Sequence, residues 1–295
     1  MNLLKHRYLS WQLAQALKTK DRLHAEKLEK YDSGILNFPV EDDTGHSALT
    51  LAVCKKSLSH VQFVMSLGAN PNLAVNVNSG LSALHYIAQT TDFDVNMKKI
   101  LVEIMHCRIE KVNVDIESVQ ILNEGTYLSQ TPLMTAVIYD NIKFIKELLL
   151  LNANINAIES MIGGTALLLA CGKANYDVIK LLLDAGADIK QSSAGQFGVL
   201  HWFANNNRDI PECVDLLISE GAIVDQASLK DRLTPLMLAA YNGLYNSVAV
   251  LLANGADPSI RDFYGRNCIT FARMLDDEQL GDKIITLISK HHNKS

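Results

Sequence analysis

The sequence has few aromatic residues and no overall excess of positive charge. Aromatic residues make up only 6% of the 295 residues, and the formal net charge is −5. Binding to nucleic acid regardless of its sequence needs a basic surface, so this charge balance argues against that function. Residues 1–30 are an exception, with seven Lys or Arg against three Asp or Glu. We interpret them as the solvated face of a terminal cap.

The cysteines show no pattern typical of metal binding or of a disulfide framework. There are five, and neither a Cys-x-x-Cys pair nor a short-spaced Cys/His set occurs. We therefore expect no metal and no cofactor. An odd number of scattered cysteines is typical of reduced thiols, which predicts an intracellular protein, cytoplasmic or nuclear.

Long apolar segments are also missing. Lys5, His6 and Arg7 interrupt the early apolar stretch, so we expect no signal peptide. The longest uncharged run, 233–256, is long enough to raise the question of a membrane span, but it contains Pro235 and several Asn residues. These residues are typical of caps and turns, and we expect no membrane insertion.

What the sequence does contain is a repeat. Thr-Pro-Leu-Met occurs at 131–134 and again at 234–237, and weaker copies recur along the chain. The Leu or Ile of each copy stands at Leu49, Leu84, Leu133, Leu167, Leu200, Leu236 and Ile269. Apart from one long gap, these positions are about 33–36 residues apart. Such a period predicts a stack of small units around an elongated core.

Within each period the residues carry a family resemblance. Small residues such as Ala136 and Ala170 follow each Leu, an apolar helix follows, and most units close with Gly-Ala, as at Gly186-Ala187. Over about residues 40–290 the chain resembles an ankyrin-repeat protein. The resemblance implies an all-α repeat solenoid of about six to seven helix-turn-helix repeats, with short β-hairpin loops and helical caps.

The repeat phrase sets the expected boundaries. They are an N-terminal helical cap at 1–38 and repeats at 39–74, 75–125, 126–159, 160–192, 193–228 and 229–261, with a degenerate C-terminal capping repeat at 262–295. The gap of 49 residues between Leu84 and Leu133 places an insertion in the second repeat, mostly within 110–128. We expect an extended finger or ordered loop there. A tolerated insertion without function is the alternative.

Several residues are expected to have structural roles. Thr131, Thr165 and Thr234 should cap first helices, and the left-handed ends of second helices fall at Gly68, Gly186, Gly221 and Gly255. The resemblance implies that His85 and His201 bind neighbouring backbone and hold adjacent turns together. A shared metal site is the alternative, but three repeats separate the two imidazoles.

The resemblance also indicates where a partner would bind. In this fold the hairpin tips and the outer ends of the first helices line the concave face and contribute little to the core. Apolar residues there predict an interface; packing between adjacent hairpins is the alternative. The predicted partner-binding residues are Tyr127, Leu128, Ile138, Tyr139, Met161, Ile162, Phe197, Tyr241, Phe263 and Tyr264.

No acid, base and nucleophile can be named that would converge on one site, so we expect no enzyme and no small-molecule substrate. The leading hypothesis is a non-catalytic protein-interaction module, acting as an adaptor, scaffold or inhibitor on one or more partner proteins. The alternative is an IκB-like ankyrin inhibitor or regulator of a transcription factor. An enzyme or a nucleic-acid binder would be the alternative of another class.

The resemblance finally implies a modification. Hairpin asparagines of ankyrin repeats can be hydroxylated, and Asn72 and Asn156 occupy the matching place. Leu148, eight residues before Asn156, fits the usual preference, whereas Asn154 replaces the usual acid.

Overall fold

The computed structural model describes residues 16, 19, 46–73, 80–106, 111–121 and 127–292. It divides the chain into two compact units, Met1–Asn154 (unit 1) and Ile155–Ser295 (unit 2). The N-terminal cap predicted at 1–38 lies outside the described residues, except for Ala16 and Thr19, which are helical.

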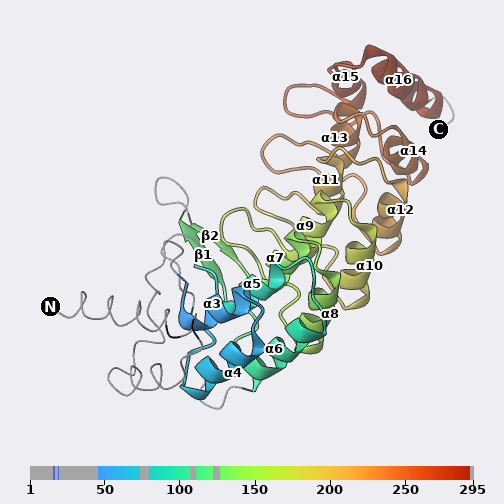
Figure 1. Ribbon diagram of the computed structural model, residues 1–295. Helices are drawn as coiled ribbons and strands as arrows, with labels where there is room; N and C mark the ends of the chain where they lie inside the picture. The colour runs from blue at the N-terminus through green and yellow to red at the C-terminus, as the bar shows by residue number, and fades with distance from the viewer. Residues whose placement is uncertain are drawn as a thin grey trace. The chain divides into compact units, whose positions relative to one another are not determined.

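Each unit is built from pairs of antiparallel helices, a short one followed by a longer one (Figure 1). Unit 1 contains α3 (Ala48–Cys54), α4 (Leu58–Ser66), α5 (Ala83–Ala88), α6 (Val95–Met105), β1 (Ser118–Ile121), β2 (Tyr127–Gln130), α7 (Pro132–Ile138) and α8 (Ile142–Leu150). Unit 2 contains α9 (Ala166–Gly172), α10 (Tyr176–Asp184), α11 (Val199–Ala204), α12 (Pro211–Ser219), α13 (Pro235–Tyr241), α14 (Tyr245–Ala253), α15 (Cys268–Ala272) and α16 (Glu278–His292).

In both units the helices form two layers. In unit 2, α9, α11, α13 and α15 pack side by side as an inner layer, and α10, α12, α14 and α16 form an outer layer. The inner helices are rich in Ala, which lets neighbours approach closely, and most of their residues are buried. The outer helices are amphipathic. In α10, for example, Val178, Ile179 and Leu182 are fully buried while Lys180 is exposed.

The inner helices begin where the repeat phrase predicts. The hydroxyls of Thr131, Thr165 and Thr234 each accept the N–H three residues further on, at 3.3 Å. Each hydroxyl thereby satisfies one of the N–H groups that have no partner within the helix. The three threonines thus lie at the N-cap positions of α7, α9 and α13.

The ends of the outer helices follow the sequence as well. Gly68, Gly186, Gly221 and Gly255 all adopt φ between 87° and 98°, which reverses the chain after α4, α10, α12 and α14. After α8 the same position is Asn152, with φ 59°. Asn tolerates this region better than most residues with a Cβ.

The insertion in the second repeat forms a β-hairpin. Strands β1 and β2 pair antiparallel, from Ser118 opposite Gln130 to Ile121 opposite Tyr127. The extended element expected in the insertion is therefore a β-hairpin, and its second strand leads directly into α7. Among the described residues this is the one sheet. In unit 2, the loops before α9, α11, α13 and α15 close through backbone hydrogen bonds and form no strands.

Turns on the outer side of the stack are tied together by Asn and Asp side chains. In unit 1 the amide of Asn72 accepts the N–H of Asn113 at 2.7 Å, and the carboxylate of Asp115 accepts the N–H of Asn154 at 2.7 Å. Asn72 also donates to the carbonyl of Lys111. Each such bond joins one repeat to the next.

Unit 2 has the same arrangement with one interruption. Asn156 accepts the N–H of Asp188 at 2.9 Å, and Asp225 accepts the N–H of Asp257 at 3.0 Å. Between them the equivalent position is Lys190, whose ammonium group can only donate. The side chain of Lys190 therefore cannot accept the N–H of Ile223, which occupies the matching place in the next turn.

Within the described helices, none combines the length and the apolarity that a membrane crossing requires. Among the described residues, no three or more His, Cys, Asp or Glu side chains gather closely enough to hold a metal ion. Cys171, Cys213 and Cys268 are buried thiols, and burial raises the pKa of each.

Candidate protein-binding surface

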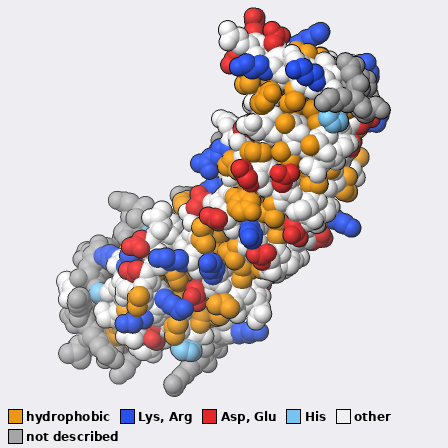
Figure 2. All heavy atoms as spheres, turned by 90° about the vertical axis from the view of Figure 1, so that its right-hand side faces the viewer, with side chains coloured by type: hydrophobic (Ala, Val, Ile, Leu, Met, Phe, Trp, Pro, Cys, Tyr) orange, Lys and Arg blue, Asp and Glu red, His pale blue; other side chains and the backbone are white. Residues whose placement is uncertain are grey.

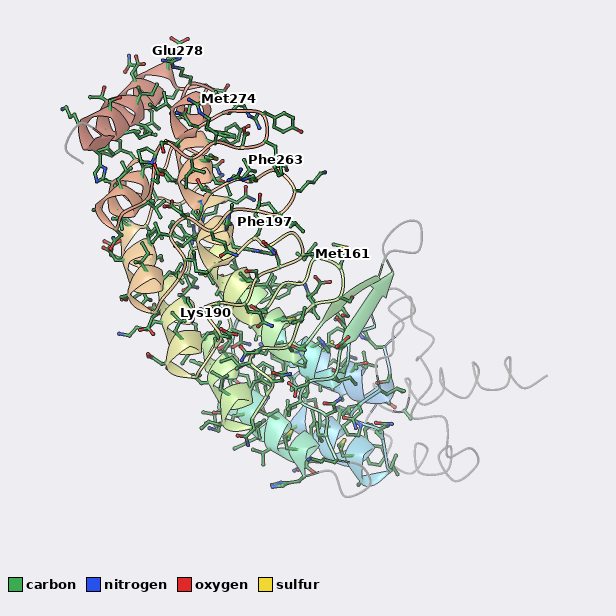
Figure 3. All side chains as sticks on the ribbon, turned by 180° about the vertical axis from the view of Figure 1, so that it is seen from behind. Met161, Lys190, Phe197, Phe263, Met274 and Glu278 are labelled. Atoms are coloured by element: carbon green, nitrogen blue, oxygen red, sulfur yellow. The ribbon has the colours of Figure 1, made fainter. Side chains whose placement is uncertain are left out.

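In unit 2 a short loop precedes each inner helix, and we call these four loops the fingers. They are 159–164, 193–197, 228–233 and 262–266. In each finger the N–H of the first residue donates to the carbonyl of the last, at 2.8–3.0 Å. Figure 3 shows Met161, Phe197 and Phe263 on three of these loops, on one side of the helices.

Buried carboxylates hold two of the fingers in shape. Glu159 is 3% exposed, and its two carboxylate oxygens accept the N–H groups of Met161 and Ile162. These bonds curl the backbone around the acid. The side chains of Met161 and Ile162 remain 41% and 39% exposed.

Asp262 does the same in the last finger. Its carboxylate accepts the N–H of Tyr264 at 2.9 Å and of Arg266 at 2.8 Å, and it pairs with Arg266 Nε at 2.7 Å. Burial alone would raise the pKa of Asp262, but these hydrogen bonds and the positive charge lower it below its ordinary value. Phe263 and Tyr264 are left 63% and 72% exposed.

Successive fingers are also joined to one another through their backbones. The N–H of Ala194 donates to the carbonyl of Ile162, and that of Leu229 to the carbonyl of Gly195, both at 2.8 Å. The N–H of Phe263 donates to the carbonyl of Asp231 at 3.2 Å. The four fingers of unit 2 therefore form one continuous hydrogen-bonded strip.

Between the fingers and the inner helices lies a groove of about 730 Å³. It is lined by Met161, Ile162, Leu169, Gly172, Lys173, Ser193, Ala194, Phe197, His201, Trp202, Asn205, Leu233 and Leu238. This volume and a mainly apolar lining with a few polar groups are typical of ligand-binding grooves.

Trp202 is the largest side chain in the groove, and two glycines make room for it. A Cβ on Gly172 would lie 3.1 Å from the indole ring, and one on Gly164 would lie 3.7 Å from it. The indole Nε1 donates to the hydroxyl of Ser193 at 3.2 Å, which fixes the ring against the second finger. The half-buried ring thus forms a rigid apolar part of the wall.

His201 supports the groove from within. Its Nε2 lies 2.9 Å from the carbonyl oxygen of Leu233, so this nitrogen is the donor, and its Nδ1 accepts the N–H of Gly198. Burial lowers the pKa of the imidazole, which is consistent with this neutral form. The ring of Phe197 stands edge-on to it, with centroids 5.3 Å apart.

His85 has the same role in unit 1. Its Nε2 lies 2.8 Å from the carbonyl of Gln130, at the end of β2, and its Nδ1 accepts the N–H of Ser82. Both histidines thus contact the backbone of the following repeat, as the family resemblance implied.

The predicted partner-binding residues occupy different environments. In unit 2, Met161, Ile162, Phe263 and Tyr264 are exposed on fingers, Tyr241 is 48% exposed at the end of α13, and Phe197 is half-buried. In unit 1, Tyr139 is 45% exposed after α7, and Ile138 is half-buried. Tyr127 and Leu128 lie in β2, but their side chains are outside the described ones. Whether any of them contacts a partner stays a prediction.

Trp202 stands directly after the histidine of the phrase, where the sequence predicts a semi-buried ring that fills the groove, but it was not among the predicted partner-binding residues. The indole ring has room in the groove because Gly164 and Gly172, which belong to the preceding repeat, have no side chain beside it. Glu159 was also missed, because an acid in a loop gives no sign of being buried. The signal available was its position, since Ser193, Ser228 and Asp262 open the other fingers at intervals of 34–35 residues.

Comparison with known proteins agrees with this architecture. A family model described as "Ankyrin repeats (3 copies)" matches residues 106–193 and 192–262, which together make up just over half of the chain. The chain belongs to the ankyrin-repeat family. Ankyrin repeats are typical of proteins that bind other proteins, and the groove and fingers lie where the family resemblance implied a concave surface.

Curated relatives match this ankyrin-repeat protein over a shorter stretch. Palmitoyltransferase ZDHHC17 of Homo sapiens is 40% identical over 94 residues, which is 32% of this chain and 15% of the relative. Palmitoyltransferase Hip14 of Drosophila melanogaster is 38% identical over 92 residues, or 31% and 14%. Palmitoyltransferase ZDHHC13 of Homo sapiens is 38% identical over 97 residues, or 33% and 15%. The similarity thus covers about one seventh of each relative.

Proposed function

We propose that this ankyrin-repeat protein is a non-catalytic interaction module, an adaptor, scaffold or inhibitor, that binds a partner protein through its fingers and groove. The observation that carries this proposal is the hydrogen-bonded strip of fingers in unit 2. It holds Met161, Ile162, Phe263 and Tyr264 in water on a backbone that is already ordered. Large apolar side chains contribute most of the energy of protein interfaces, and ordering them before binding lowers the entropic cost.

The exposed apolar residues do little for the fold. The turns around Met161 and Tyr264 are fixed by Glu159 and Asp262 through backbone N–H groups, and those bonds do not depend on the identity of the exposed side chains. A surface that is apolar without contributing to the core is typical of a binding site.

The buried thiols of Cys171, Cys213 and Cys268 are consistent with a reducing compartment. We therefore propose that the protein works inside the cell, in the cytoplasm or the nucleus. The relatives are named as palmitoyltransferases, but the alignments cover only a small part of each. Our proposal of protein binding rests on the ankyrin repeats themselves, and it does not include palmitoyl transfer.

The test is proximity labelling in the native cell, comparing the unaltered protein with a triple variant, Met161→Ser, Ile162→Ser and Phe197→Ala, whose three positions all line the groove. We expect the triple variant to lose the labelled partners while its circular dichroism and melting temperature stay close to those of the unaltered protein. A matched control replaces Tyr176 and Ile223, which are 37% and 56% exposed but do not line the groove. Partners that survive the triple variant with the fold intact would show that this surface is not the binding site.

A further inference from the structure

The third and fourth fingers of unit 2 carry an excess of positive charge. With the residue directly before the fourth finger, they contain four basic residues, Lys230, Arg232, Arg261 and Arg266. Against these stand two acids, Asp231 and Asp262, and Asp262 pairs with Arg266 at 2.7 Å. No carboxylate in the described parts of the chain pairs with the other three basic residues, which are all exposed. Two more positive than negative charges are therefore presented here, with every acid counted.

The outer helices of the same unit have the opposite balance. Helices α10, α12 and α14 contain four acids and one base, Lys180. Figure 2 shows the side of the molecule on which the outer helices lie, and acidic side chains are scattered over it. The acids at 276–278 follow α15, at the opposite end of that helix from the fourth finger. An acidic ligand would thus be attracted to the fingers and repelled by the outer helices.

Large apolar side chains stand beside these cations. Leu229 and Phe263 each come second in their finger, and they are 64% and 63% exposed. The N–H of Phe263 donates to the carbonyl of Asp231, which holds the two fingers side by side. The guanidinium of Arg232 lies 5.9 Å from the ring centroid of Phe263. Exposed aromatic rings next to Arg are the combination in which protein interfaces are enriched.

The fourth finger also ends the hydrogen-bonded strip. In the first three fingers, the carbonyl bonded by the next finger belongs to the residue before one with positive φ, namely Ile162, Gly195 and Asp231. In the fourth finger Gly265 has φ 75°, so the matching carbonyl is that of Tyr264. Within the described part of the chain no N–H donates to it. The strip therefore ends on an acceptor to which the backbone of another chain can add.

We propose that an extended, acidic segment of a partner protein docks on the third and fourth fingers of unit 2. Its carboxylates pair with the three cations that have no acidic partner, and an apolar side chain packs on the ring of Phe263. One of its backbone N–H groups donates to the carbonyl of Tyr264, so that the segment lengthens the strip. This inference rests on the proposed function and names the chemistry of the partner.

The experiment selects ligands without assuming a sequence. A random-peptide phage library is panned on the whole chain, and the peptide enriched most is synthesised with a fluorescent label for anisotropy. We expect it to contain Asp or Glu near a Leu, Phe or Trp. Replacing its acids by Asn and Gln should weaken binding about tenfold or more, and added salt should weaken the acidic peptide selectively.

A second set of peptides tests the backbone contact. Each amide nitrogen of the enriched peptide is methylated in turn, which removes one N–H donor at a time. We expect methylation at one internal position to weaken binding about tenfold. A peptide that tolerates methylation at every position does not add to the strip, and this result would overturn the inference.

Variants of the protein then locate the site. Lys230→Glu with Arg232→Glu should abolish binding of the acidic peptide, and replacing both by Gln should weaken it less. Phe263→Ser with Tyr264→Ser should weaken binding about tenfold, because the bonds that shape this finger come from backbone groups. The matched control, Lys180→Glu with Lys283→Glu, makes the same change in net charge at exposed positions on α10 and α16. This control should bind as the unaltered protein does, and circular dichroism checks the fold of each variant.

The outcomes separate this inference from the proposed function. Enriched peptides that lack acids, or that are lost with the groove triple variant and not with the finger variants, would overturn the inference and leave the proposed function standing. Peptides insensitive to both groups of variants would contradict both. If no peptide is enriched, the inference of a linear segment fails, and proximity labelling still decides the proposed function.

A last arm tests the class of ligand. Single-stranded oligo(dT) also offers negative charge and flat rings, and it is used as a competitor for the labelled peptide. We expect it to displace the peptide less effectively than the unlabelled peptide does. Displacement at a lower concentration of oligo(dT) would assign the surface to nucleic acid and overturn the inference.

Discussion

The Nε2 atom of His85 lies 2.8 Å from the carbonyl oxygen of Gln130, which is 45 positions further along the chain. Because a carbonyl can only accept, Nε2 carries the hydrogen and Nδ1 is left to accept the N–H of Ser82. The imidazole is therefore held neutral, and a second proton would have to sit where Ser82 already donates. Burial lowers the pKa of His85 to about 4, against the weaker opposing effect of the bond to Gln130.

This relationship predicts a loss of stability in mild acid. The unfolded chain takes up the proton near pH 6.5, whereas folded His85 does so only near its lowered pKa. Stability is thus present above about pH 6.5 and declines toward pH 4, by up to about 3 kcal/mol for this residue. Urea unfolding between about pH 7 and pH 4.5 measures it. In His85→Gln this part of the pH dependence should disappear, and an unchanged pH slope in that variant would contradict the assignment.

A second prediction concerns Asp209, which caps a helix of the next repeat. Its carboxylate accepts the N–H groups of Asn246 and Ser247 and the hydroxyl of Ser247, at 2.7–2.8 Å. Asp209→Ala leaves these donors without that partner, and we expect it to lower the free energy of unfolding by about 2 kcal/mol. Asp209→Asn, which keeps one acceptor oxygen, should cost about half as much. Asp184→Asn on the exposed surface of α10 is the control and should change stability little.

A third prediction concerns the series of side-chain hydrogen bonds between successive outer turns, which is interrupted at Lys190. Asn156 and Asp225 each accept an N–H from the following turn, whereas Lys190 cannot accept. Lys190→Asn should accept the N–H of Ile223 and raise the free energy of unfolding by about 0.5–1 kcal/mol. Lys190→Gln removes the same charge with a longer side chain and should not give this gain. Equal stability of the two variants in urea unfolding would show that the geometry of the turn is not the cause.

A fourth prediction concerns Gly198, where the preference for a capping side chain and the lack of space for one have opposite effects on stability. Gly198 stands where Thr165 and Thr234 cap neighbouring helices, so Gly198→Thr would be expected to stabilise α11 by about a few tenths of a kcal/mol. A Cβ there would instead overlap the amide of Gln226, which donates to Ser192 and to the Gln196 carbonyl. We expect Gly198→Thr to destabilise the protein by about 1–2 kcal/mol.

The double-mutant cycle with Gln226→Ala tests this fourth prediction. Removing the amide opens the space, so the double variant should be more stable than the sum of the two single changes. Additive effects would mean that Gln226 does not restrict position 198.

An interaction can be predicted from this sequence when the residues that form it are close together in the chain. The caps at Thr131, Thr165 and Thr234 reach only three residues, and the positive φ of Gly186 is a property of one residue. Both can therefore be read from the repeat phrase. The roles of His85 and His201 were also predictable, but only because the resemblance supplied a partner in the next repeat.

Interactions that cross between repeats without a shared motif could not be predicted. Asp209 caps a helix 37 residues away, and Trp202 depends on Gly172 in the preceding repeat. The length of the gap in the second repeat predicted an extended element or an ordered loop there. Its strand pairing, from Ser118 to Gln130, depends on register that the repeat period does not contain.

The bonds that join the fingers run from main chain to main chain, at Ala194 to Ile162, Leu229 to Gly195 and Phe263 to Asp231. Almost any amino acid can form such bonds, so the strip of fingers keeps its geometry when the exposed residues on it are replaced. Under the proposed function, ligand preference and folding are thereby encoded at largely separate positions. We expect a small set of substitutions at the tips to redirect the protein to a new target, and an engineer could vary those tips without redesigning the helices beneath them.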